Sequence, residues 1–215
     1  SPQALCRQLT EEGLGQAEVF VGERLGAPEE RIRQGRAESL AKEEFGQPSV
    51  MLVCARPMAA GGFGLRDECF VRGRVPMTKS EVRALVLSRL GMQPGDIAYD
   101  IGAGTGSISV EMALAAWEGQ VYAVEQNPQA AELIRENRRR LGAFAIQVVE
   151  GRAPAALAEL PAPDKAVIGG SGGSLGEILA LLLDKNPAVR VVITAITPET
   201  VSQALAAIRA LPMGE

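Results

Sequence analysis

The chain contains no histidine among its 215 residues. It therefore cannot carry a Ser-His-Asp or Cys-His catalytic machine, a histidine general base or a metal held by histidine. Cysteine is scarce as well: Cys6, Cys54 and Cys69 lie far apart and form no CxxC pair. This spacing predicts free thiols, as in the reducing cytoplasm, and no metal site.

An excess of basic residues is also missing, because the formal net charge is −4. Nucleic-acid binding usually needs a positive field, so we expect no nucleic-acid partner. No apolar run is long enough to cross a membrane and no signal peptide is recognisable, so we expect no membrane partner either. The 47% of hydrophobic residues can supply a core for one or two domains.

The chain divides into three parts by pattern. Residues 1–56 contain a thin α/β pattern that suggests a piece of a larger domain. Residues 57–75 are rich in glycine and turn residues and predict a linker. Residues 76–215 form the third part. In the first part we predict helices at 3–12 and 36–44 and strands at 17–21 and 49–54.

The third part alternates apolar strands with helices. A helix is predicted from Thr78 to Leu90, with Val82, Leu85, Val86 and Leu90 on its buried face. The strands are predicted at 96–101, 120–125, 145–150, 165–170 and 189–196. Five strands joined by helices predict a parallel, doubly wound sheet with ligands beyond the carboxyl ends of the strands.

The segment YDIGAGTGSIS, residues 99–109, places a glycine-rich turn after the first of these strands. The dinucleotide fingerprint G-x-G-x-x-G needs a third glycine at position 107, where this chain has Ser107, so an NAD-dependent dehydrogenase is disfavoured. The pattern G-x-G-x-G resembles motif I of methyltransferases that use S-adenosylmethionine (SAM). The alternative is an ordinary strand-to-helix turn without a ligand.

Glu125 ends the second strand, about 20 positions after the glycine turn. A carboxylate there can accept hydrogen bonds from both hydroxyls of a ribose, which SAM and NAD share. The alternative is a strand-end carboxylate in water, whose loss would hardly change the stability of the unliganded chain.

Further candidates surround the turn. Thr78 and Glu81 form a capping box that can also close over a cofactor. Ala153 and Pro154, in the segment EGRAP, either offer backbone groups to an adenine or form a plain turn. The segment IGGSGG, residues 168–173, gives room to a bulky flat substrate. Ile134 and Leu141, on either side of the basic segment 135–140, are expected to be buried, and the charges of that segment are expected to be solvated.

Taken together, VPMTKSEVRAL, YDIGAGTGSISVEMA, VEQN, EGRAP and IGGSGG resemble the decarboxylating precorrin-6Y C(5,15)-methyltransferases. LTEEGLGQAEVFVGERLGAPEERI and GLRDECF resemble the end of the tetrapyrrole methylase domain that is fused to them. The resemblance implies that residues 1–56 are the C-terminal portion of that domain. It implies that residues 76–215 are a Rossmann-like SAM-dependent methyltransferase that lacks its last two strands.

The resemblance also implies a site and a reaction. The cofactor SAM would be bound by the residues Thr78, Asp100, Gly102, Ala103, Gly104, Thr105, Gly106, Glu125 and Ala153. The tetrapyrrole substrate would lie against Gly169, Gly170, Ser171, Gly172 and Gly173. The reaction is methylation of carbon 15 with decarboxylation of the ring C acetate, in a cytoplasmic homo-oligomer of cobalamin biosynthesis. Arg152 departs from the family pattern, which often has an acidic residue there.

The substrate carries many carboxylates, so nearby cations are candidates to bind it. They are Arg66, Arg72, Arg74, Lys79 and Arg83, for which a solvated linker is the alternative. Two other functions stay open. One is a SAM-dependent methyltransferase for RNA or protein, and the other is a SAM-binding fragment without catalysis.

Overall fold

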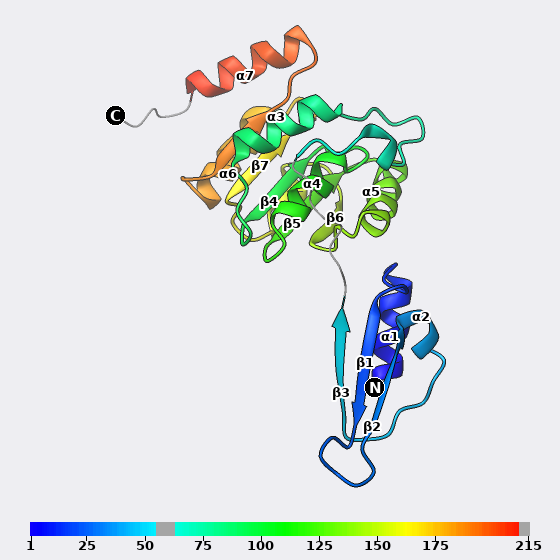
Figure 1. The fold of residues 1–215 in the computed structure, drawn as a ribbon. Coiled ribbons are helices and arrows are strands. Elements are labelled where there is room, and N and C mark those ends of the chain that lie inside the picture. Colours follow the sequence, from blue (N-terminus) through cyan, green and yellow to red (C-terminus); the bar gives the residue numbers. More distant parts are fainter. Residues whose placement is uncertain (55–62, 211–215) are drawn as a thin grey trace. The chain divides into compact units, whose positions relative to one another are not determined.

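The computed structural model describes residues 1–54 and 63–210. The chain folds into two compact units, Ser1–Ala59 and Ala60–Glu215 (Figure 1). Within the described residues no helix is long and apolar enough to span a bilayer. Cys6, Cys54 and Cys69 are free thiols, as the sequence predicts.

The first unit is an antiparallel sheet of three strands in the order β2-β1-β3, with helices on one face. Its elements are α1 (Pro2–Glu11), β1 (Glu18–Glu23), β2 (Arg31–Arg36), α2 (Ala37–Leu40) and β3 (Ser49–Cys54). Phe20 of the central strand pairs with Gln34 on one side and Leu52 on the other. The helix predicted over 36–44 is wrong beyond Leu40. The sequence analysis missed β2 because RIRQGR has a single apolar residue, Ile32, and no alternation.

The second unit alternates strands and helices. Its elements are η1 (Asp67–Cys69), α3 (Ser80–Leu90), β4 (Ile97–Ile101), α4 (Ser107–Ala115), β5 (Gln120–Glu125), α5 (Pro128–Arg140), β6 (Ile146–Glu150), η2 (Ala155–Leu157), β7 (Lys165–Ile168), α6 (Leu175–Lys185), β8 (Arg190–Ile193) and α7 (Pro198–Ala210). The five strands pair in parallel in the order β6-β5-β4-β7-β8, which confirms the predicted doubly wound sheet.

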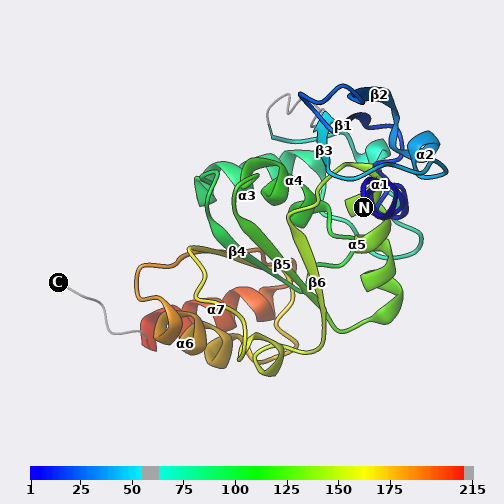
Figure 2. The same cartoon turned by 90° about the horizontal axis from the view of Figure 1, so that it is seen from below.

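Helices cover both faces of this sheet (Figure 2). On one face α3, α4 and α5 build a core that contains Leu87, Val110 and Ile134. On the other face α6, through Leu182, and α7 pack over Tyr99 and Ile168. Because β4 is central and the chain continues outward from it in both directions, the strand order reverses beside β4. In such sheets this reversal is where ligands bind.

Part of the predicted linker 57–75 is not a linker. Its residues up to 62 lie outside the described part of the chain, but the rest packs onto the second unit. Phe70 is buried there, and Leu65 and Cys69 pack against the same core. Asn137 of α5 bonds to both backbone groups of Val71. The glycine and turn residues correctly indicated an irregular backbone. They do not show whether such a backbone packs against a hydrophobic core.

The start and the buried face of α3 also differ from the prediction. The capping box is wrong, since α3 begins at Ser80 and its N-cap Lys79 makes no side-chain capping bond. Instead, Asp67 caps the helix from outside by accepting a hydrogen bond from the Ser80 N–H at 3.1 Å. Val86 and Leu90 are buried as predicted. Val82 and Leu85 are instead exposed at 44% and 56%, and Arg83 is fully buried.

Candidate cofactor and substrate site

The glycine turn joins β4 to α4 and is fixed to the neighbouring strand. The N–H groups of Gly102 and Ala103 both donate to the carbonyl of Val124, at 2.9 and 3.2 Å. Gly102, Gly104 and Gly106 have positive φ angles of 74°, 58° and 74°. Side chains disfavour this region, so three glycines in five residues are required by the turn itself.

The three glycines have different surroundings. A Cβ on Gly102 would lie 2.7 Å from the backbone nitrogen of Gly170, so the turns after β4 and β7 touch through their backbones. A Cβ on Gly106 would lie 2.9 Å from Ile134 of α5. Gly106 thus provides the close packing that a dinucleotide fold obtains from its third glycine. At Gly104 the nearest atom is the Pro76 carbonyl oxygen, at 3.5 Å, so a side chain has room there.

Glu125, at the end of β5, is held by two backbone N–H groups. Its carboxylate accepts hydrogen bonds from Gly104 at 2.9 Å and from Asn127 at 2.8 Å. The residue is 9% exposed, so a plain strand-end carboxylate in water is the wrong alternative. Each carboxylate oxygen can accept a second hydrogen bond, which leaves acceptors for a ligand.

Asp100 lies in β4 behind the turn and is 2% exposed. Burial raises the pKa of its carboxyl to about 6, hydrogen bonds from Ser109 oppose this, and the nearby charge of Glu125 adds to it. The Ser109 hydroxyl donates the side-chain bond from the first turn of α4. Asp100 therefore joins β4 to α4 through its carboxyl group.

A cleft of about 200 Å³ opens between the turns that follow β4, β5, β6 and β7. Of the predicted residues it brings together Gly102, Glu125, Ala153, Gly170, Ser171 and Gly172. Its lining does not include Thr78, Asp100, Ala103, Gly104, Thr105 or Gly106. The sequence analysis missed Ile101, Val124, Gln126 and Gly151 in the lining. Their places at or just after strand ends were the available signal.

A second cavity of about 380 Å³ lies on the other side of the loop after β7. The predicted Gly169 and Gly173 line this cavity, together with the Gly170–Gly172 segment that both cavities share. Thr194, Thr197, Thr200 and Gln203 add hydroxyl and amide groups to its wall. The loop after β7 therefore separates two cavities. One lies beside Glu125, and the other is lined by this loop, the end of β8 and α7.

Arg152 takes part in this arrangement, although the sequence analysis regarded it only as a departure. Its side chain lines the cleft, and its Nη2 donates to the Gly172 carbonyl at 2.7 Å. One arginine thus joins the turn after β6 to the loop after β7.

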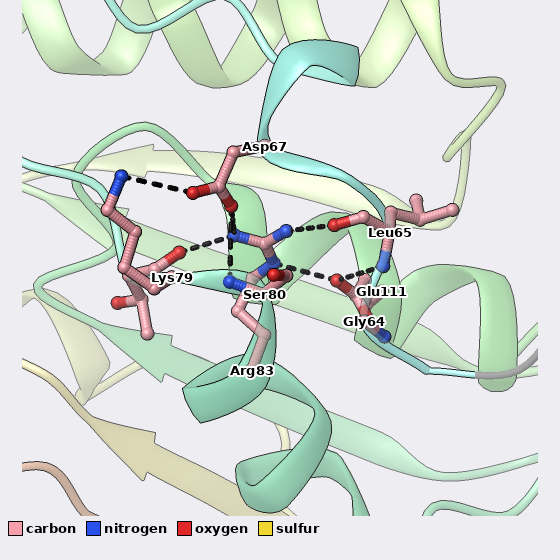
Figure 3. A network of polar contacts seen from close by, with 8 residues as sticks. Gly64, Leu65, Asp67, Lys79, Ser80, Arg83 and Glu111 are labelled. Atoms are coloured by element: carbon pink, nitrogen blue, oxygen red, sulfur yellow. Dashed lines mark hydrogen bonds and ion pairs between the residues drawn. The ribbon is translucent and has the colours of Figure 1, made fainter.

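The cations proposed for the substrate divide into two kinds. Arg66, Arg72 and Arg74 are exposed, and Lys79 is 60% exposed while it pairs with Asp67 at 3.1 Å. The prediction that Arg83 binds the substrate is wrong, because its guanidinium is fully buried and bonds to Asp67 at 2.9 Å and to Glu111 at 2.7 Å (Figure 3). It also donates to the carbonyls of Thr78 and Leu65, and its side chain is 0% exposed, so a substrate cannot reach it.

Metal ligands do not gather anywhere in residues 1–54 and 63–210, where no group of three histidine, cysteine or acidic side chains could hold an ion. The site consists of backbone groups, the accepting carboxylate of Glu125, the side chain of Arg152 and open space at the reversal point of the sheet. These features define the second unit as a methyltransferase-type domain of the Rossmann-like class. A SAM-dependent O-methyltransferase from Thermotoga maritima shares the fold, with a TM-score of 0.58 over 94% of this chain and 81% of its own, at 15% identity.

The family follows from the sequence comparison. The family described as "Precorrin methyltransferase domain" matches residues 68–214, and the chain belongs to it. A Sinorhizobium protein named precorrin-6Y C(5,15)-methyltransferase [decarboxylating] is 36% identical over 92% of this chain and 49% of its own length. The chain thus spans about half the length of that relative.

Shorter relatives match a smaller part of the chain. A Pyrobaculum calidifontis protein named probable cobalt-precorrin-6B C(15)-methyltransferase (decarboxylating) is 40% identical over 67% of this chain and 76% of its own length. Among solved structures, a precorrin-6Y C5,15-methyltransferase from Geobacter metallireducens has a TM-score of 0.65 at 36% identity. It covers 68% of this chain and 79% of its own.

Proposed function

We propose that the second unit binds SAM in the cleft beside Glu125 and methylates carbon 15 of a precorrin or cobalt-precorrin, with decarboxylation of the ring C acetate. The observation that carries this is the glycine turn bonded to Glu125 at the mouth of the cleft, in a chain of the precorrin methyltransferase family. The names of the relatives supply the substrate, the carbon atom and the decarboxylation.

The residues present fit this cofactor. The free acceptor positions of Glu125 suit the two ribose hydroxyls, and two backbone N–H groups already fix its carboxylate. Gly102 has no side chain to fill the cleft, and Ala153, 7% exposed, lines the wall after β6. Of the other predicted cofactor residues, Ala103 to Gly106 form the turn itself and Asp100 lies behind it, whereas Thr78 bonds to Arg83 through its carbonyl.

When bound, SAM supplies a methyl group on a sulfonium centre that an electron-rich ring carbon can attack. The chain has to hold the two reacting atoms in line, an effect worth up to about 7–11 kcal/mol. No strong base is required, in keeping with a sequence without histidine. The electron pair released by loss of carbon dioxide enters the conjugated macrocycle, so the protein need not supply an electron sink.

The substrate side is proposed to be the glycine loop 169–173 and the cavity beyond it. Small residues there let a flat macrocycle approach the cleft closely. Its carboxylates would meet exposed cations, for which Arg66, Arg72, Arg74 and Lys79 remain candidates and to which Arg152 is added.

The first unit is proposed to be the C-terminal portion of a tetrapyrrole methylase domain. The match to the Sinorhizobium relative supports this, because it extends over 92% of the chain and thus beyond residues 68–214. No glycine-rich strand-to-helix turn occurs in residues 1–54, so this unit is expected to bind no SAM. A cytoplasmic homo-oligomer that binds no nucleic acid stays a prediction, which light scattering and an RNA titration at low salt would check.

An assay with precorrin and cobalt-precorrin substrates tests the function. Methyl transfer from SAM with release of carbon dioxide, lost in Glu125→Gln at limiting SAM, is the expected result. Turnover on RNA or protein, or SAM binding without any turnover on tetrapyrroles, would replace the proposal by one of the two alternatives.

A further inference from the structure

Asn137 of α5 is a fully buried asparagine in a helix rich in arginine. Its side-chain oxygen accepts from the Val71 N–H at 2.7 Å. Its side-chain nitrogen donates to the Val71 carbonyl at 2.8 Å and to the Thr105 carbonyl at 2.9 Å. Both N–H groups of the amide are therefore used, and the side chain ties residue 71 to the glycine turn.

Residues 64–79, here called the strap, are held by this anchor at Val71 and by a second anchor on both sides of Val71. The second anchor is Arg83, which bonds to Asp67 of the strap and to Glu111 of α4 (Figure 3). Glu111 also accepts from the N–H groups of Gly64 and Leu65, at 2.6 and 3.1 Å. The hydrogen bonds and charges of Arg83 and Lys79 outweigh the burial of Asp67 and lower the pKa of its carboxyl, so Asp67 stays charged at neutral pH.

Between Asn137's partner Val71 and Ser80, where α3 begins, the strap passes the glycine turn. The Pro76 carbonyl and the Val75 side chain are the nearest atoms to the Cβ position of Gly104, at 3.5 and 3.9 Å. The strap thus forms the outer wall of the turn. Three glycines with positive φ have many other conformations open to them, so the bonds from outside must select this one.

We propose that Asn137 is a positioning residue for the cofactor, which it serves by fixing the Thr105 carbonyl and the strap in one arrangement. The inference rests on the proposed function, because it assigns a role toward the ligand of that same site. Asn137 is not among the residues that line the cleft, and it acts on the site through its bond to the Thr105 carbonyl of the turn. It differs from a residue that merely stabilises the fold, because its loss should weaken binding in molecules that remain folded.

A calorimetric titration with S-adenosylhomocysteine on the whole chain tests this with Asn137→Ala. The matched control is Asn186→Ala, because Asn186 likewise bonds a carbonyl and an N–H, those of Pro163 and Ala188. These lie at the amino ends of β7 and β8, at the edge of the sheet away from the turn. We expect about tenfold weaker binding in Asn137→Ala and less than about twofold weakening in the control.

The stoichiometry of the same titration reports the folded fraction, and the dissociation constant reports the site. Equal dissociation constants in the two variants, with the wild type binding normally, would overturn the inference alone. A wild-type chain that binds no S-adenosylhomocysteine would overturn the proposed function as well. If Asn137→Ala does not fold, Asn137→Ser, which puts a short hydroxyl in place of the amide, replaces it, and an unchanged dissociation constant there overturns the inference.

Discussion

Each unit contains an arginine that bonds to two acidic side chains and lies over an aromatic ring, but the two arginines differ in how far they are buried. In the first unit Arg33 bonds to Glu23 and Glu43 at 3.0 and 2.8 Å and lies 4.3 Å from the centre of the Phe45 ring. In the second unit Arg83 bonds to Asp67 and Glu111 and lies 4.7 Å from the Phe70 ring centre. The Arg33 side chain is 25% exposed, whereas that of Arg83 is 0% exposed.

This difference teaches that burial, and not the number of bonds, decides what a charged residue does here. A cluster in contact with water gains little, since water can replace either partner. A buried cluster cannot lose one partner without leaving another charge in the core. The fully buried Arg83 cluster also fixes the strap beside the site, whereas the Arg33 cluster, whose arginine is 25% exposed, holds an antiparallel sheet. That sheet lacks a common edge of parallel strand ends, where a cofactor would bind.

The largest expected effect therefore follows from Arg83→Met. Loss of the guanidinium leaves Glu111 and Asp67 without their main partner, which should lower the free energy of unfolding by about 3–5 kcal/mol. Arg33→Met in the first unit is the matched substitution, with an expected loss of about 1 kcal/mol. Urea unfolding, followed for each unit by hydrogen exchange, measures both.

Comparable losses of unfolding free energy in the two variants would contradict the claim that burial decides the effect of a charged residue. If Arg33→Met were the more damaging change, burial would not be the deciding factor.

The buried Asp100 gives a second test of how burial affects a charged group, through the pH dependence of the unfolding free energy. The folded-state pKa of Asp100 is raised to about 6, above about 3.9 in the unfolded chain. Between about pH 3.9 and about pH 6, Asp100 is mostly protonated in the folded state and mostly ionised in the unfolded state. The stability that comes from this proton binding is therefore lost as pH rises. Asp100→Asn keeps an acceptor for Ser109 and cannot titrate. Relative to wild type, its unfolding free energy should increase by on the order of 2 kcal/mol from pH 4 to pH 7.

Urea titrations at several pH values provide this measurement. A constant difference between the variant and wild type across the range would mean that Asp100 ionises normally in the fold.

Glu125→Gln is expected to act mainly on binding. The variant removes the charge that would hold the ribose, so SAM and S-adenosylhomocysteine should both bind about 5- to 150-fold more weakly. Methionine alone should not respond. Because Glu125 also accepts from Gly104 and Asn127, a loss of stability of about 1 kcal/mol is now expected, unlike the initial expectation. Unchanged SAM affinity at matched pH and salt would place the ribose elsewhere.

The sequence predicted the sheet of the second unit well, because each strand is an apolar run bounded by clear turn and cap signals. The helix α5, for example, begins with Asn127 as its N-cap and Pro128 as its first residue. The burial of Arg83, Glu111 and Asn137 was missed because these residues occupy helical positions where apolar residues are expected. Asn137 lies at the buried spacing of Ala130, Ile134 and Leu141, and only this spacing could have revealed it.

Long-range pairing accounts for the other differences. Arg83 shares its face of α3 with Val86 and Leu90, but the apolar Val82 and Leu85 favoured a different face. Neither partner of Arg83, in the strap or in α4, could be identified from local sequence. The same holds for Arg152, whose partner Gly172 lies 20 residues away on another turn.

The central claim is that the chain has one cofactor site, at the glycine turn of the second unit. A calorimetric titration with S-adenosylhomocysteine of the wild type and of Gly104→Val tests it most directly. Position 104 has room for a side chain, but its φ of 58° strains a β-branched residue and distorts the turn. We expect one molecule bound per wild-type chain and none by the variant, whose circular dichroism stays that of a folded protein. Two molecules per chain, or undiminished binding by the folded variant, would contradict the claim.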